Sequence, residues 1–370
     1  MTVRADLEQC LQLADVEKEK TWVKPVPLDR IGAAILPATD IYPVAGGMCH
    51  FSQIDVCSLN TNSNTVLIWR GRVSDWLTHT QQKQFAEETL HRLVSGRSGF
   101  AGLAMSCPQV MGIVNVTPDS FSDGGQFSNS INAVAHANQL VSEGASIIDV
   151  GGESTRPGAT PISVKEEQER VIPVISNLSN NDILVSADTR HPDTMQKALQ
   201  AGAQIINDVS GFRNSKSINL IANAHDNNSP PYVVIMHMQG EPGFMQHAPS
   251  YQFAPIEIYD YLEQQIVKLV AAGIDKSYIA VDVGFGFGKT ISDNLALLDW
   301  MPLFHGLGVP ILLGVSRKST IAKLDNNASI DSRLGGSIAL TMRALNAGVQ
   351  MVRTHDVKQT IQAIKLWQAD

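Results

Sequence analysis

Short apolar runs alternate with amphipathic stretches from about residue 110 to the end of the chain. The runs are brief and rich in β-branched residues, which is typical of strands buried on both faces of a parallel sheet. The expected strands are Val110–Val116, Ser146–Val150, Ile183–Ala187, Gln204–Ile206, Tyr232–Met236, Tyr278–Val281, Pro310–Leu313 and Gln350–Val352. Helices are expected between them at Asn132–Glu143, Val164–Leu178, Thr194–Ala201, Ile256–Ala272 and Leu334–Ala347.

This alternation predicts an α/β protein built on a (β/α)8 TIM barrel. Eight strand–helix units over about 260 residues match the size and the strand count of that fold. The alternative is a doubly wound open sheet, whose usual G-x-G-x-x-G turn follows the first strand. No such turn follows Val110–Val116, and the pattern therefore favours the barrel.

The pattern before residue 106 is irregular. Thr65–Trp69 reads as a strand and Gln81–Ser95 as an amphipathic helix. The small and polar segment Ser95–Gly99 suits a linker. We therefore divide the chain into residues 1–105, an N-terminal extension or small α/β domain without an assigned role, and residues 106–370, the barrel.

Composition narrows the class of protein. Hydrophobic residues make up 44% and charged residues 17%, so the chain can bury a large core. A net charge of -8 argues against a nucleic-acid partner but leaves room for a local basic pocket. The four cysteines form no C-x-x-C pair, which is typical of reduced thiols in a cytoplasmic protein. The polar N-terminus and the lack of long apolar runs predict neither a secretory signal nor a membrane span.

Polar residues follow each expected strand, and in this fold the carboxyl ends of the strands carry the chemistry. The residues expected at this rim include Asn115, Asp149, Asp188, Asn207, Asp208, His237, Asp282, Arg317, Lys318, Arg353 and His355. Any one of them has a structural explanation, such as capping a helix or filling a polar core position. The whole set converging on one mouth favours a binding site.

Positively and negatively charged side chains are expected after different strands of this rim. The last two strands bring cations to the place where such barrels often hold phosphate. The third, fourth and sixth strands bring Asp188, Asn207 and Asp282, which suit a ring rich in N–H donors. The implied ligand is a hydrogen-bonding heterocycle attached to a phosphate or diphosphate.

Three sequence motifs of other enzyme classes are incomplete or absent. Gly284–Thr290 ends like a phosphate-binding loop, but Val283 stands where that motif needs glycine. No H-E-x-x-H sequence is present, and neither Ser154 nor Ser316 has the G-x-S-x-G context of a nucleophile. Zinc protease and serine hydrolase chemistry therefore have no support.

Long motifs in the barrel region resemble the dihydropteroate synthase family over about residues 109–370. They are Met111–Gly125, Asp149–Gly158, Asp188–Thr189, Ile206–Asp208, Met236–Gly240, Asp282–Lys289, Gly314–Ser319 and Arg353–Asp356. The resemblance implies a (β/α)8 barrel and a transferase of folate biosynthesis. Such an enzyme condenses 6-hydroxymethyl-7,8-dihydropterin diphosphate with p-aminobenzoate to give 7,8-dihydropteroate and diphosphate. The chain departs from the family at Val283, which replaces the usual proline.

The resemblance also implies roles for individual residues. The pterin would be held by Asp188, Asn207, Met236, Asp282, Lys318 and Arg353. The diphosphate would be held by Asn115, Arg156, Arg353 and His355, with Asn115 also binding Mg2+. p-Aminobenzoate would lie near Thr155, Pro157, Phe287 and Ser316. The catalytic residues would be Asp188, Lys318, Arg353 and His355. Loops 117–127 and 153–160 would act as lids, and the family implies a homodimer.

We expect an SN1-like step, in which Mg2+ and cationic residues stabilise the leaving diphosphate and Asp188 stabilises the electron-poor pterin methylene. One alternative is a pterin-binding barrel of the methyltransferase type, which needs no diphosphate cations. A second alternative is a catalytically silent paralogue that only binds pterin. The presence of Asn115, Arg156 and His355 argues against silence.

Overall fold

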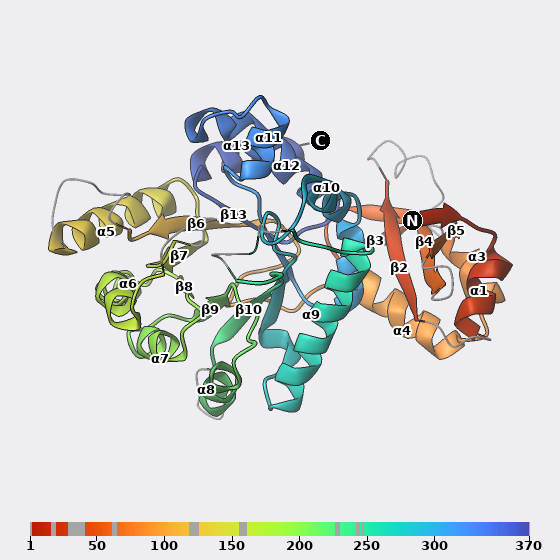
Figure 1. Cartoon of the computed structure of the whole chain (residues 1–370), viewed down its shortest axis with the longest axis horizontal. Coiled ribbons are helices and arrows are strands. Elements are labelled where there is room, and N and C mark those ends of the chain that lie inside the picture. The colour runs from red at the N-terminus through yellow and green to blue at the C-terminus, as the bar shows by residue number, and fades with distance from the viewer. Residues whose placement is uncertain are drawn as a thin grey trace.

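The structure is a computed structural model of the chain, and it describes residues 2–15, 20–28, 41–60, 65–117, 126–154, 161–225, 230–241, 245 and 248–369. Two bodies lie side by side along the long axis of the molecule, a helix-wrapped barrel and a smaller sheet with its own helices (Figure 1). The barrel begins at Gln109, and the smaller sheet is formed entirely before that residue.

Eight parallel strands close the barrel in the order β10-β11-β12-β13-β6-β7-β8-β9. Their bounds are β6 Gln109–Asn115, β7 Ile147–Gly151, β8 Val185–Asp188, β9 Ile205–Asp208, β10 Tyr232–Met236, β11 Ile279–Asp282, β12 Ile311–Gly314 and β13 Met351–Thr354. The last strand pairs with the first, Met351 opposite Gln109. The prediction of a (β/α)8 barrel is confirmed, and every expected strand is present with ends shifted by no more than a few residues.

Helices surround these strands on the outside (Figure 1). They are α5 Gln126–Ser142, α6 Val164–Ser179, α7 Pro192–Gln200, α8 Ser215–His225, α9 Ala254–Ala271, α10 Ile291–Asp299, α11 Ser319–Leu324, α12 Leu334–Asn346 and α13 Val357–Gln368. Short 3-10 turns are η3 Lys276–Tyr278, η4 Met301–Leu307 and η5 Ile330–Arg333. Local chemistry sets several starts. Thr290 and Asp293 form a reciprocal capping box on α10, and Ser163 caps α6 by accepting from the amide of Glu166.

The floor of the barrel interior is closed by residues 100–105, which directly follow the predicted linker Ser95–Gly99. Phe100 and Met105 are buried against inward-facing strand residues such as Ile147, Ile205 and Met351. The Phe100 ring lies 4.9 Å from the ring of Tyr232 at the start of β10. Residues 100–105 therefore belong to the core of the barrel, although they precede its first strand.

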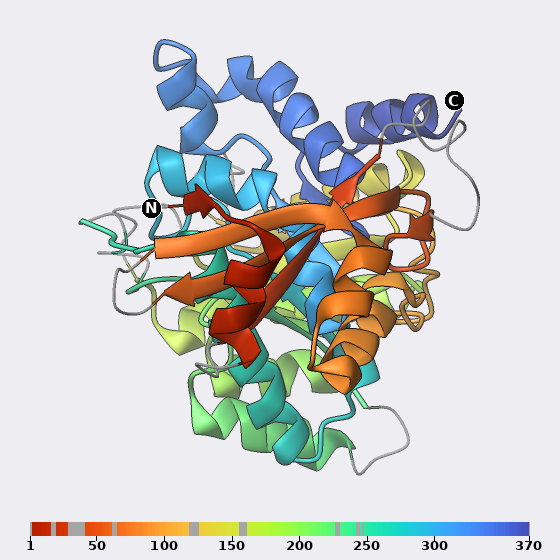
Figure 2. The same ribbon diagram turned by 90° about the vertical axis from the view of Figure 1, so that its right-hand side faces the viewer.

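The smaller sheet has the order β1-β5-β4-β2, with β3 paired to β4. Its elements are β1 Thr2–Arg4, α1 Leu7–Asp15, β2 Thr21–Pro27, β3 Tyr42–Pro43, β4 His50–Asn60, β5 Thr65–Arg72, α3 Val73–His79 and α4 Lys83–Val94 (Figure 2). The predicted strand at Thr65–Trp69 and the predicted helix at Gln81–Ser95 are present as β5 and α4. The remaining strands and helices of this sheet were not predicted from the sequence.

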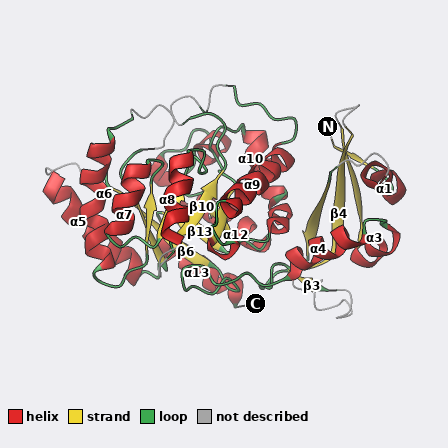
Figure 3. Cartoon of the chain, turned by 90° about the horizontal axis from the view of Figure 1, so that it is seen from below, coloured by secondary structure: helices red, strands yellow, loops and turns green. Residues whose placement is uncertain are grey.

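Both faces of this sheet are covered. On one face, Val23, Val56 and Trp76 pack in a cluster of their own with the helices α1, α3 and α4. On the other face, Trp22, Cys57 and Val66 join the hydrophobic core that the barrel helices form. Figure 3 shows the sheet standing beside the barrel next to α9 and α10.

Polar contacts fix the sheet to the barrel. Lys20 pairs with Asp260 and Glu263 of α9 at 2.8 and 2.5 Å. The indole of Trp22 donates to the same Asp260 at 2.9 Å. The half-buried guanidinium of Arg97, which follows α4, donates to the carbonyl of His305 in η4 at 2.8 Å. The N-terminal sheet is therefore docked on the barrel through matched apolar and charged groups. In the described part of the chain, no helix has the length and apolar character needed to cross a membrane.

Candidate active site at the barrel mouth

The predicted pterin residues stand at the carboxyl ends of neighbouring strands. Asp188, Met236 and Asp282 end β8, β10 and β11, and Asn207 lies one residue before the end of β9. Arg353 lies one residue before the end of β13. Because parallel strands of a barrel end on one rim, these side chains meet at one mouth. Lys318 follows β12 at the same rim.

Arg353 joins two acidic side chains across this mouth. Its Nε donates to Asp149 at 2.6 Å, and its Nη2 donates to Asp188 at 2.7 Å. The amide nitrogen of Asn207 donates to the same oxygen of Asp149 at 3.2 Å. Asp149 is fully buried, and its second oxygen has no hydrogen-bond partner among the described residues. Asp149 thus orients both Arg353 and Asn207, a role that was not predicted although the residue was placed at the rim.

The electrostatics of this network follow from two carboxylates sharing one guanidinium. Burial raises the pKa of Asp188 to about 7, and the nearby Arg353 only partly offsets that effect. Burial acts to lower the pKa of Arg353, but the adjacent Asp149 and Asp188 carboxylates outweigh it and hold that pKa above its usual range. The guanidinium is therefore permanently charged, and Asp188 is the group that can change its charge near neutral pH.

The opposite side of the mouth carries Asp282 and Lys318. One oxygen of Asp282 accepts from the amide of Gly284 at 2.7 Å, and burial raises the pKa of its carboxyl. The Lys318 ammonium lies 3.9 Å from the centre of the Phe287 ring and forms no hydrogen bond with any described residue. Burial, together with the nearby Arg353 charge, lowers the pKa of Lys318 to about 8. This ammonium is available to a ligand.

Ser316 and His355 form a hydrogen-bonded pair beside these cations. The backbone amide of His355 donates to the Ser316 hydroxyl at 3.1 Å, and that hydroxyl lies 3.0 Å from Nδ1 of the same imidazole. Burial and the neighbouring Arg353 lower the pKa of His355 to about 3, so the ring is neutral. If the hydroxyl donates to Nδ1, then Nε2 carries the proton and is a donor for an anion.

Three residues from the predicted rim have structural partners instead. Arg317, grouped with the phosphate-binding cations in the sequence, pairs with Asp356 at 2.5 and 3.1 Å. Asp208 accepts from the amides of Ser210 and Phe212 and so holds a turn. The third residue, His237, contacts the buried ammonium of Lys289. For these three side chains, the structural explanation is sufficient.

Several predicted site residues lie in or beside parts of the chain that the structure does not describe. Thr155, Arg156 and Pro157 fall outside the described residues, as does most of loop 117–127. Asn115 ends β6, is half-buried, and forms no hydrogen bond with a described residue. In the described ranges, no group of three or more acidic, histidine or cysteine side chains could hold a metal ion.

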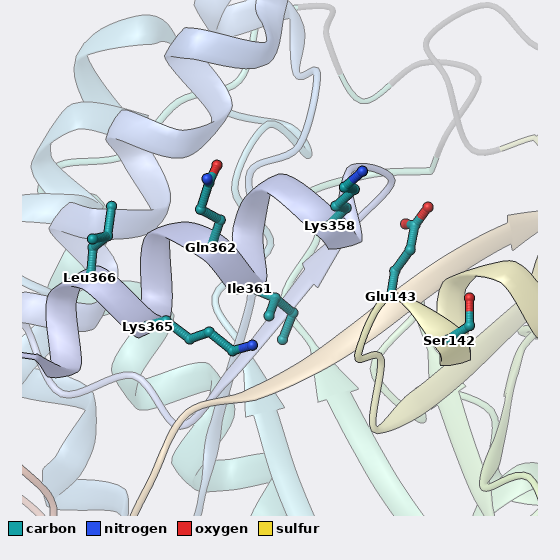
Figure 4. A pocket seen from close by; sticks show the side chains of 7 residues that line it. All are labelled: Ser142, Glu143, Lys358, Ile361, Gln362, Lys365 and Leu366. Carbon is teal, nitrogen blue, oxygen red and sulfur yellow. The ribbon is translucent and has the colours of Figure 1, made fainter.

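A separate groove lies on the outside of the barrel. It has a volume of about 550 Å³ and runs between the end of α5 and the helix α13, with Glu143, Ile361 and Lys365 among its lining residues (Figure 4). None of the predicted site residues contributes to it. The groove therefore belongs to the helical exterior and not to the mouth.

The barrel, with its acids facing cations at one rim, defines a pterin-binding enzyme. The family model described as "Pterin binding enzyme" matches residues 111–355. The chain belongs to the family of dihydropteroate synthases. The dihydropteroate synthase of Escherichia coli K12 is 44% identical over 268 residues, which are 72% of this chain and 93% of that protein.

Solved structures agree with this membership. The dihydropteroate synthase of Xanthomonas albilineans with 4-aminobenzoic acid has a TM-score of 0.67 and 44% identity, and covers 73% of this chain and 96% of its own. The same organism's enzyme in complex with 7,8-dihydropteroate has a TM-score of 0.65 and 41% identity over 72% of this chain and 95% of its own. The family model begins at residue 111, so the N-terminal sheet lies outside it.

Proposed function

We propose that this site condenses 6-hydroxymethyl-7,8-dihydropterin diphosphate with p-aminobenzoate to give 7,8-dihydropteroate and diphosphate. The observation that carries this proposal is the meeting, at one mouth, of acids suited to a pterin with cations suited to a diphosphate. Asp188 and Asp282 belong to the first group, and the cation Arg353, together with the neutral donor His355, belongs to the second. A barrel that bound only an uncharged pterin would have no need of the second group.

The pterin ring would lie between β8, β9, β11 and β13. Asp188, Asn207 and Asp282 offer oxygen acceptors for its N–H groups, and all three are at least mostly buried. Hydrogen bonds to charged acceptors in a shielded site are stronger and more selective than those at a surface. Met236, which is 3% exposed, would provide an apolar wall for the ring.

The diphosphate would lie toward β12, β13 and β6. His355, as a neutral donor, and Arg353, as a fixed cation, are in place on β13 and just after it, while Arg156 is assigned from the resemblance alone. Mg2+ typically binds through one or two protein oxygens together with substrate phosphates. Asn115 supplies one such oxygen, which suits a metal that enters with the diphosphate. When bound there, Mg2+ would neutralise charge on the leaving group.

p-Aminobenzoate would lie on the Phe287 and Ser316 side of the mouth, with Thr155 and Pro157 assigned from the resemblance. Phe287 is 9% exposed and presents an aromatic ring beside Lys318. An aromatic face suits the arene of p-aminobenzoate, and the backbone N–H of Ser316, a hydrogen-bond donor, suits the carboxylate.

In the reaction, the C–O bond between the pterin methylene and the diphosphate breaks, and both bonding electrons leave with the diphosphate. The arylamine nitrogen then forms the C–N bond and releases one proton. Positive charge develops on the pterin methylene between these events. An ionised Asp188 would stabilise that charge, while Arg353 keeps the carboxylate in place. No covalent bond to the protein is needed.

The test measures diphosphate release and dihydropteroate formation with both substrates present. We expect both products only when pterin diphosphate and p-aminobenzoate are combined. Calorimetric titration of pterin diphosphate, with and without Mg2+, separates the alternatives. A silent paralogue would bind the pterin diphosphate without turnover, and a methyltransferase-type barrel would bind a pterin lacking diphosphate equally well.

Other expectations from the sequence stay predictions. We propose an N-terminal domain over residues 1–105, whose last six residues pack into the floor of the barrel, together with a homodimer and a cytosolic location. The cysteines at positions 10, 49, 57 and 107 form no disulfide in the described part of the chain, which is compatible with the last of these. The mobile-lid role of loops 117–127 and 153–160 also stays a prediction.

A further inference from the structure

The loop between β11 and α10, residues 283–290, is built around one buried lysine. Lys289 is 3% exposed. Its ammonium donates to the carbonyls of Gly284 and Phe287 at 2.8 and 2.9 Å. It also lies 3.1 Å from Nδ1 of His237 and 3.3 Å from the His237 carbonyl. Three ammonium hydrogens thus face four acceptors, and every acceptor belongs to this loop or to the end of β10.

In the described part of the chain, this lysine has no acidic hydrogen-bond or ion-pair partner. Burial lowers the pKa of His237 to about 2, so the imidazole is neutral and its Nδ1 accepts from the lysine. Burial lowers the pKa of Lys289 to about 7, although the charge of Asp282 acts to raise it, and the hydrogen bonds of the ammonium must offset the cost of burying it. Lys289 is therefore bound through backbone carbonyls, which makes it sensitive to the path of the loop.

The loop is closely packed against the segment that follows β10. A Cβ on Gly284 would lie 1.8 Å from the carbonyl oxygen of His237, and one on Gly288 would lie 2.5 Å from that of Gln239. The hydroxyl of Tyr251 donates to the Gly288 carbonyl at 2.8 Å. These contacts restrict the backbone conformation of the loop. Lys289 connects the first half of the loop to the second through its hydrogen bonds.

Phe287 is the residue of this loop whose ring lies beside the Lys318 ammonium. Its ring packs with Met236 and Met238, and it supports the Lys318 ammonium at 3.9 Å. Lys289 holds the carbonyl of this same residue at 2.9 Å. A continuous path of contacts therefore runs from the buried lysine, through the Phe287 backbone and ring, to the available cation at the mouth.

We propose that Lys289 is a positioning residue, which fixes the Phe287 ring and the Lys318 ammonium at the boundary between the pterin and p-aminobenzoate. This inference rests on the proposed placement of p-aminobenzoate against Phe287. Lys289 touches neither substrate and acts only through the loop.

The first experiment replaces the lysine with an apolar residue of similar length, Lys289→Met. We expect the KM for p-aminobenzoate to rise about tenfold, equivalent to about 1.4 kcal/mol. The affinity for the pterin, measured by calorimetry, should change less than this KM, because Asp188, Asn207 and Asp282 lie on strands and only Lys318 depends on the loop. Equal changes for both substrates, or none for p-aminobenzoate, would overturn the proposal.

A matched control removes a buried lysine from the N-terminal sheet. Lys24 is 8% exposed and lies 2.8 Å from Asp55. Lys24→Met should lower the melting temperature and leave both Michaelis constants unchanged. If Lys24→Met also raised the KM for p-aminobenzoate, the effect of Lys289→Met would reflect general destabilisation, and the proposal would fail.

A double-mutant cycle tests the route through the ring. In a Phe287→Ala background, Lys289→Met should raise the KM for p-aminobenzoate by less than about twofold more, because coupled residues are not additive. A full second increase would show that the lysine does not act through Phe287. A normal KM in Phe287→Ala itself would instead refute the placement of p-aminobenzoate. If Lys289→Met does not fold, Tyr251→Phe removes one bond to the same loop, and an unchanged KM there would also overturn the proposal.

Discussion

The Arg353 guanidinium donates to one oxygen of the Asp188 carboxylate at 2.7 Å, although 165 positions of sequence separate the two residues. The arrangement leaves the second oxygen for the pterin. Burial keeps the pKa of Asp188 near neutrality, and the Arg353 charge, which is shared with Asp149, offsets the effect of burial only in part.

Asp188→Asn keeps the shape of the side chain and removes its charge. We expect the single-turnover rate at saturating p-aminobenzoate to fall by about 10²–10³, which is typical for loss of one electrostatic group at a developing charge. Pterin affinity should fall less, because the bound ring is neutral. Asp299→Asn, at an exposed surface acid, is the control and should be normal. Weak binding with a normal rate would refute a charge-stabilising role.

The same carboxyl predicts a pH dependence. The raised pKa means that Asp188 is protonated below about pH 7 and ionised above it, so kcat/KM for the pterin should rise through this region. It should fall again as Lys318 loses its proton near pH 8. Asp188→Asn should abolish the acidic limb and keep the alkaline one. An acidic limb that persists in the variant would assign it to another group.

His355 is a better residue than Arg353 for a test of diphosphate binding. Arg353 also bonds directly to Asp188 and, through Asp149, helps to orient Asn207. His355→Ala should weaken binding of pterin diphosphate by about 2–4 kcal/mol, the usual effect of removing one partner in a shielded charged contact. The pterin alcohol should bind almost normally. Calorimetry with both ligands decides the point, and equal losses would place His355 away from the diphosphate. Arg353→Ala should weaken both ligands.

Phe100 ties the segment before the barrel to the barrel core. Phe100→Ala should reduce the free energy of unfolding by about 3–5 kcal/mol, as for other fully buried aromatic residues. Its kcat/KM should be normal, because the floor lies at the opposite end of the strands from the mouth. Chemical denaturation and steady-state kinetics measure the two quantities. A large kinetic defect in a folded variant would show that the floor and the mouth are coupled.

A related comparison concerns truncated chains. A fragment starting near Gln109 keeps every predicted site residue, yet it loses Phe100, Met105 and the cover of the N-terminal sheet. A fragment starting at Gly96 keeps the floor. We expect some synthase activity in both, with a lower melting temperature for the shorter one. Equal stability would mean that the floor contributes little.

The barrel was predictable from the sequence because its strands are buried on both faces and read as continuous apolar runs. Tyr232–Met236 was located at its observed bounds. The rim residues followed from the fold, since a strand end fixes where the next side chain lies. The N-terminal sheet was less predictable, because β2 alternates Trp22, Lys24 and Val26 with residues that face the opposite side. This alternation does not reveal that the face carrying Trp22, Lys24 and Val26 is covered by the barrel.

Pairwise geometry within the site was not predictable. The sequence placed Asp149 and Arg353 on the same rim but could not show that they bond, since 204 positions separate them. It grouped Arg317 with the site cations, and only the contact with Asp356 shows otherwise. The buried Lys289 looked like part of a failed phosphate-binding motif. Its role depends on where four acceptors lie in space, which residue order does not encode.

The docking of the N-terminal sheet has a consequence for synthesis on the ribosome. Lys20 meets Glu263, 243 positions later, and Cys49 meets the carbonyl of Leu345, 296 positions later. At about 5–20 residues per second, the first of these partners follows on the order of 10–50 s behind. The sheet can form early around the hydrophobic cluster that it makes with its own helices. Its other face, which packs on the barrel, stays exposed to solvent until the barrel has folded. Nascent chains of this protein should therefore recruit chaperones through Trp22 and its neighbours.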